Sequence, residues 1–79
     1  MKAKIRITLK KGVLDPQGKA IEGALGSLGF TGVGNVRQGK YIELEMTEND
    51  AETARSQIRS MCEKLLANTI IENYDIELA

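Results

Sequence analysis

The first residues of the chain alternate between apolar and polar side chains with a period of two. Residues 2–10 place one set on each side: Ala3, Ile5, Ile7 and Leu9 against Lys2, Lys4, Arg6, Thr8 and Lys10. This period is typical of a strand that covers a core with one face and meets solvent with the other. Residues 71–78 alternate in the same way, with Tyr74, Ile76 and Leu78 on the apolar side. The pattern therefore predicts a strand near each end of the chain.

A first helix is predicted from Asp15 to about Leu28. Asp15 is a good N-cap, and Pro16 suits the first helical position, where no amide hydrogen is needed. Gly29 follows the last apolar position and supplies the usual left-handed stop. We expect the stripe with helical spacing to be buried, namely Ile21, Ala24, Leu25 and Leu28.

A second helix is predicted from about Asp50 to Ala67, with Asn68 as its C-terminal stop. Its central apolar stripe consists of Ala54, Ile58, Met61 and Leu65. Three more residues widen that stripe on one side: Ala51, Cys62 and Leu66. This helix should therefore lie with one face on the core.

Two further strands are predicted between the helices, over residues 33–37 and 40–47. They flank Gln38-Gly39, a pair typical of a tight hairpin turn, which would set Val36 opposite Tyr41. The element order is then βαββαβ in a single domain, residues 1–79. Two right-handed crossovers joined by a hairpin predict an α+β, ferredoxin-like fold, in which a four-stranded antiparallel sheet carries two helices on one face.

Charge supports a central position for the first strand in that sheet. Lys4 and Arg6 would lie on the open face between acidic residues of both neighbouring strands: Glu43, Glu45, Asp75 and Glu77. Cross-strand pairs of opposite charge favour this register.

Composition narrows the class of protein. The chain has 79 residues, 11 basic and 11 acidic side chains and no net charge. A domain of this size has a thin core and often gains stability by forming oligomers. A nucleic-acid binder usually shows a basic excess, and no apolar run approaches the length of a membrane span. The single cysteine fits a reducing, cytoplasmic location. We therefore expect a partner other than nucleic acid or membrane.

The residue types that usually carry catalysis are scarce. The chain has no histidine, the commonest general base and metal ligand. Gly12 and Gly18 suggest a phosphate loop, but five residues separate them instead of four, and Ala20 follows Lys19 where a hydroxyl is required. We expect no catalytic, cofactor-binding or metal-binding residue in this chain.

The open face of the sheet offers one apolar spot, formed by Val36 and Tyr41. An RNA-binding sheet of this topology would stack bases on outward aromatic residues, but Glu43 and Glu45 would repel phosphate. Pairing with a second copy would bury the spot on both molecules. Val36 and Tyr41 are therefore a predicted homodimer face.

The segments GVLDPQGKAIEGALGSLGF and VRQGKYIELE resemble the PurS family, the small subunits of phosphoribosylformylglycinamidine (FGAM) synthase. The resemblance covers essentially the whole chain, including its length and its βαββαβ order. The chain departs from the family at Thr69, where a proline is usual, and we regard this change as harmless.

The resemblance implies a role in purine biosynthesis. The synthase makes formylglycinamidine ribonucleotide from formylglycinamide ribonucleotide, glutamine and ATP. A glutaminase subunit releases ammonia, and a large synthetase subunit consumes it with ATP and Mg²⁺. The small subunit binds no cofactor, bridges the other two and assists ammonia transfer. It forms homodimers and sometimes dimers of dimers.

Two loops carry the resemblance, and we expect them to contact partner subunits. The first comprises Asp15, Pro16, Gln17 and Gly18. The second comprises Arg37, Gly39, Lys40 and Tyr41. In a ferredoxin-like path these loops would lie at opposite ends of the sheet and make two separate contacts. An alternative is a small-molecule sensor similar to ACT regulatory domains, which share the topology and bind ligands at dimer interfaces.

Overall fold

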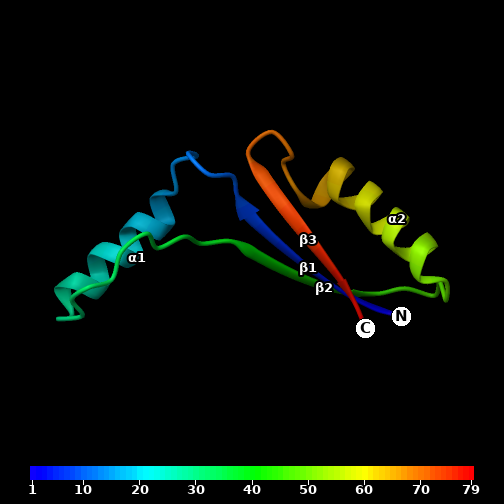
Figure 1. Cartoon of the computed structure of the whole chain (residues 1–79), viewed down its shortest axis with the longest axis horizontal. Helices are drawn as coiled ribbons and strands as arrows, with labels where there is room; N and C mark the ends of the chain where they lie inside the picture. Colours follow the sequence, from blue (N-terminus) through cyan, green and yellow to red (C-terminus); the bar gives the residue numbers. More distant parts are fainter.

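A three-stranded antiparallel sheet forms the centre of the computed structural model, which describes residues 1–79. The elements are β1 (Lys2–Leu9), α1 (Pro16–Ser27), β2 (Lys40–Glu45), α2 (Ala51–Met61), the π-helical turn η1 (Cys62–Leu66) and β3 (Glu72–Leu78). The strand order β2-β1-β3 confirms the α+β class and the central position of β1. In Figure 1, α2 lies over the sheet whereas α1 projects away from it. None of the helices has both the length and the apolar character needed to cross a membrane.

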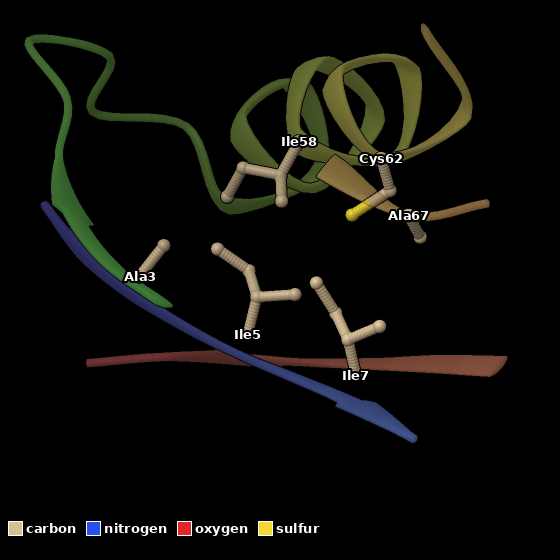
Figure 2. Packing of buried hydrophobic residues seen from close by; sticks show 6 residues of the cluster. All are labelled: Ala3, Ile5, Ile7, Ile58, Cys62 and Ala67. Atoms are coloured by element: carbon tan, nitrogen blue, oxygen red, sulfur yellow. The ribbon is translucent and has the colours of Figure 1, made fainter. Parts of the chain in front are cut away.

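The core lies between β1 and the helix α2 with its extension η1. Ala3, Ile5 and Ile7 are fully buried, as the alternation of β1 predicts. Their side chains point toward Ile58 and Cys62 (Figure 2). Apolar residues of the outer strands complete this layer at partial burial, including Ile42, Leu44, Tyr74, Ile76 and Leu78. The predicted inward faces of β1 and β3 are thus confirmed, and that of α2 is confirmed at Ala54, Ile58 and Cys62 but not at Ala51, which is exposed.

The opposite face of the sheet is a ladder of ion pairs. The Nζ atom of Lys2 lies 2.9 Å from Glu43, and Nη1 of Arg6 lies 3.1 Å from Glu77. The guanidinium of Arg6 also lies 5.7 Å from the ring centroid of Tyr41. The predicted cross-strand charge pairing is therefore present on this face.

The end of the second helix differs from the prediction. The amide of Ala67 donates to the carbonyl of Cys62 at 3.0 Å, a bond that spans five residues as in a π-helix. The wider turn rotates the last residues relative to α2. Ala67 is consequently buried, while Leu65, which was expected in the central stripe, is 82% exposed.

The predicted strand over residues 33–37 is absent, and so is the hairpin at Gln38-Gly39. The prediction of four strands in one chain was therefore wrong. Residues 28–39 instead return beside α1 (Figure 1). The amides of Val36 and Gln38 bond to carboxylates of the α1 region, and Asn35 has a positive φ of 55° that interrupts extended backbone.

We call residues 12–39 the arm and the remaining residues the body. Within the arm α1 begins and ends as predicted. Asp15 is its N-cap, and Gly29, with φ of 94°, ends it. The amides of Gly29 and Phe30 bond to the carbonyls of Gly26 and Leu25, the two bonds of a Schellman motif.

The predicted burial of the α1 stripe was wrong for the isolated chain. Ile21 is 41% exposed and Leu28 is 73% exposed. Phe30 and Val33, in the return segment, are also exposed. The helix has its expected apolar face, but no part of the same chain covers that face.

Candidate functional site

The two loops that carry the family resemblance meet at the base of the arm. The carboxylate of Asp15 accepts the amide of Gly18 at 2.8 Å and the amide of Gln38 at 2.7 Å. The prediction that these loops lie at opposite ends of the sheet was therefore wrong. Because no hairpin forms, the chain returns along α1 and brings Gln38 back to the helix start.

Asp15 is the only buried charged residue of the chain, with 4% of its surface exposed. Its hydrogen bonds to the Gln38 and Gly18 amides lower the pKa of this carboxyl group below its ordinary value, and the nearby Arg37 guanidinium, with Nε 4.0 Å away, adds to the effect. Asp15 is therefore ionised at neutral pH, and both of its oxygens already hold backbone amides.

Two more side chains connect the outgoing and returning parts of the arm base. Glu22, on α1, accepts the amide of Val36 at 3.1 Å. Arg37 donates from Nη2 to the carbonyl of Lys10 at 3.2 Å, just beyond the end of β1. We call the set Asp15, Gly18, Glu22, Val36 and Gln38 the clasp.

Two glycines of the motif permit close approach of backbone segments. A Cβ atom on Gly18 would overlap the carbonyl oxygen of Val36, and one on Gly39 would overlap the carbonyl oxygen of Ile7. Glycine is the residue that allows such contacts. Gly18, which in the sequence suggested a phosphate loop, therefore allows α1 to approach the return segment closely.

A shallow hollow of about 300 Å³ lies beside the clasp. Pro16, Gln17, Gly39 and Lys40 line it together with residues of the body. Lys40 pairs with Glu72 at 3.3 Å. The pKa of Glu72 is lowered mainly by its hydrogen bond to the Asn68 amide and then by Lys40. Six of the eight predicted partner-binding residues thus lie around this hollow or the clasp, together with Arg37 beside them.

Tyr41 lies apart from this site. Its hydroxyl donates to Glu43 at 3.0 Å on the charged face of the sheet. Since no hairpin sets Val36 opposite Tyr41, the predicted apolar spot of these two residues is not formed within the chain. Three contributors to the site were missed: Glu22, Gln38 and Glu72. Glu22 carried one usable signal, because it lies two helical turns after Asp15 and so on the same side of α1.

The sequence and the shape of the chain both resemble those of known proteins. The sequence profile of the PurS family of phosphoribosylformylglycinamidine (FGAM) synthase matches residues 2–79. The chain belongs to the PurS family. It is 51% identical over 75 residues to FGAM synthase subunit PurS of Synechocystis, covering 95% of this chain and 75% of that protein. It is 47% identical over 77 residues to the subunit of Bacillus subtilis, covering 98% and 90%.

Solved PurS structures share the shape of the chain. The crystal structure of Methanocaldococcus jannaschii PurS, one of the subunits of formylglycinamide ribonucleotide amidotransferase in the purine biosynthetic pathway, has a TM-score of 0.86 at 45% identity and covers 96% of this chain and 92% of its own. A chain in the structure of PurLQS from Thermotoga maritima has a TM-score of 0.87 at 33% identity, covering 96% and 93%. Because so little of the chain is left unmatched, the projecting arm is part of the shape that PurS proteins share. These likenesses favour the PurS assignment over the ACT-like alternative.

Proposed function

We propose that this PurS protein is a non-catalytic bridging subunit of FGAM synthase, active as a homodimer in which the arms of two copies are exchanged. It holds the glutaminase and the large synthetase subunit in register, so that ammonia released by one reaches the other. The ATP and Mg²⁺ of the reaction belong to the synthetase subunit. The observation that carries the proposal is an arm whose apolar face is uncovered within its own chain.

The arm exposes four large apolar side chains that lie close together in the sequence. Leu28 is 73% exposed, Phe30 58%, Val33 44% and Ile21 41%. These residues belong to α1 and to the segment that follows it directly. An exposed apolar patch of this kind marks an interaction surface. The residues that bury this apolar surface must therefore belong to another molecule.

The body offers a matching surface. A ferredoxin-like sheet carries two helices on one face, and here only α2 covers it. Ile42, Leu44 and Met46 of the β2 side are only partly buried against the core. A helix from a second copy would complete that layer and bury both apolar surfaces.

The outer edge of β2 is also free. Met1 and Met46 exchange two backbone hydrogen bonds. Because hydrogen-bonded and non-bonded pairs alternate along an antiparallel ladder, the backbone groups of Leu44, Ile42 and Lys40 also point toward β1. Tyr41, Glu43 and Glu45, which lie between them, direct their backbone groups outward. Residues 33–37 of a second copy would supply the missing partner strand. The predicted four-stranded, ferredoxin-like sheet would then form between two chains.

Domain swapping exchanges an identical element between two copies. Gln38-Gly39 would be the hinge, because it joins the return segment to the start of β2. Dimers of dimers would use other surfaces. The contacts of Pro16, Gln17, Arg37, Gly39, Lys40 and Tyr41 with the large subunits remain predictions.

Reconstitution of the reaction tests the function. Purified glutaminase and synthetase subunits would be assayed for glutamine-dependent synthesis of formylglycinamidine ribonucleotide, with and without this protein. We expect the glutamine reaction to require the protein and the ammonia-dependent reaction of the synthetase to proceed without it. Equal glutamine-dependent rates in both samples would refute the bridging role. Saturable binding of an amino acid by the isolated protein would instead support the ACT-like alternative.

A further inference from the structure

We infer that Asp15 is a positioning residue, whose buried carboxylate holds the outgoing and returning segments of the arm together at its base and so prepares the arm for exchange with a second copy. The link to exchange rests on the proposed function, whereas the role within the chain does not. The inference stands on the geometry of the clasp.

Asp15 makes one hydrogen bond more than a helix cap requires. Its bond to the Gly18 amide, at 2.8 Å, is the ordinary cap of α1. Its bond to the Gln38 amide, at 2.7 Å, reaches a residue 23 positions away in the return segment. One carboxylate therefore joins the start of the arm to its end.

The N-cap of α2 provides a comparison within the same chain. Asp50 accepts the amide of Thr53 at 2.9 Å and its hydroxyl at 2.7 Å. Both bonds stay within the first turn of one helix. Asp50 thus performs capping alone, and a change at that position controls for the capping function of Asp15.

Hydrogen bonds from side chains to the backbone connect the segments at the base of the arm. Leu14, beside the N-cap of α1, is 73% exposed. The connections across the base are made by Asp15, by Glu22 to the Val36 amide and by Arg37 to the Lys10 carbonyl. Because only a few such bonds hold the two segments at the arm base, loss of one should separate them without removing the core of the body.

Asp15 acts from inside the chain and not by touching a partner. Its side chain is buried, and its two oxygens are both occupied by amides. A buried carboxylate with satisfied hydrogen bonds is costly to replace by a group that cannot accept both. Asp15→Asn keeps one oxygen for the Gly18 amide but sets an NH₂ donor against the amide of Gln38.

The test compares Asp15→Asn with Asp50→Asn in the full-length protein. For Asp15→Asn we expect the exchange of the Gln38 amide hydrogen to accelerate about tenfold or more, while amides of β1 keep their protection. We also expect the homodimer dissociation constant to rise about tenfold and glutamine-dependent synthesis to fall, with ammonia-dependent synthesis unchanged. Asp50→Asn should leave the Gln38 amide and the dimer unchanged.

A second variant opens the clasp without altering a charge. Gly18→Ala would push the return segment away from α1, because its Cβ meets the Val36 carbonyl. We expect it to reproduce the effects of Asp15→Asn on the Gln38 amide and on the dimer. If Asp15→Asn leaves the Gln38 amide protected, or if Asp50→Asn weakens the dimer equally, the positioning role is refuted. If the wild-type protein proves dispensable for the glutamine reaction, the proposed function fails while the Gln38 measurement still decides the role of Asp15.

Discussion

The body and the arm of this protein are held together by opposite means. In the body, side chains from β1 and α2 such as Ile5 and Ile58 are fully buried against each other, and charges lie on the outer face. In the arm, buried Asp15 and the amides around it form the inside, while Leu28 and Phe30 face outward. The body therefore has a core within a single chain, whereas the apolar face of the arm has no cover within that chain.

The largest effect should come from breaking the apolar contact of the body. Ile58→Ala removes a fully buried side chain from the core, and such changes cost about 2–5 kcal/mol of unfolding free energy. Urea denaturation of this variant should show that loss. Leu65→Ala, on the same helical segment but 82% exposed, is the control and should change the unfolding free energy by less than about 0.5 kcal/mol. Equal losses for the two variants would contradict the core described here.

A charge on the arm should separate assembly from folding. Leu28→Asp places a carboxylate on the apolar face of α1, so we expect the homodimer to weaken about tenfold or more. Sedimentation equilibrium would measure the dissociation constant, and urea denaturation would verify that the body still unfolds cooperatively. Leu65→Asp, at a position that is also exposed but lies on the body, is the matched control. A dimer that resists Leu28→Asp would show that the arm is not its interface.

Removal of two basic residues at the arm base should have a moderate effect. Arg37→Ala with Lys40→Ala deletes the bond to the Lys10 carbonyl and the pair with Glu72. We expect weaker assembly with the glutaminase and synthetase subunits, because both residues lie beside the hollow, and an unchanged body. Gel filtration of the mixed subunits is the measurement. An elution profile identical to that of the wild type would argue against a partner contact here.

The smallest effect should be the response of the arm to acid. The folded pKa of Asp15 lies below its ordinary value of 3.8, so the stabilisation it provides is complete at higher pH and is lost as the pH falls through the folded pKa. Dimer affinity of the wild type should therefore decline below about pH 4, more steeply than that of Asp15→Asn. Parallel declines in the two proteins would assign the acid response to other carboxylates.

Most of the body could be predicted because the patterns there refer to partners within the chain, although the π-helical turn that exposes Leu65 left no signal in the apolar periodicity. The alternation of residues 2–10, the stripe with Ala54 and Ile58, and the charges beside Arg6 all have their counterparts in the fold. In the arm, the same kind of pattern gave a wrong prediction of burial within the chain. Its helix limits were correct, but periodicity identifies an apolar face without saying which chain covers it.

The candidate site was likewise predicted only in part. The motif marked Asp15 and Gly18 as important and explained the cap correctly. The bond from Asp15 to Gln38 could not be foreseen, because the Gln38-Gly39 pair was interpreted as a hairpin turn. A turn signal describes local backbone preference, while here Glu22 and Asp15 bind the amides of Val36 and Gln38 and hold this segment against α1.

Isotope-filtered nuclear Overhauser spectra of a mixed dimer test the central claim most directly. One half of the sample would carry ¹³C-labelled methyl groups and the other half none, so that only contacts between copies are detected. Arm exchange predicts intermolecular contacts from the methyl groups of Ile21 and Leu28 to those of Ile42 and Leu44. A dimer whose spectra show none of these intermolecular contacts would refute arm exchange.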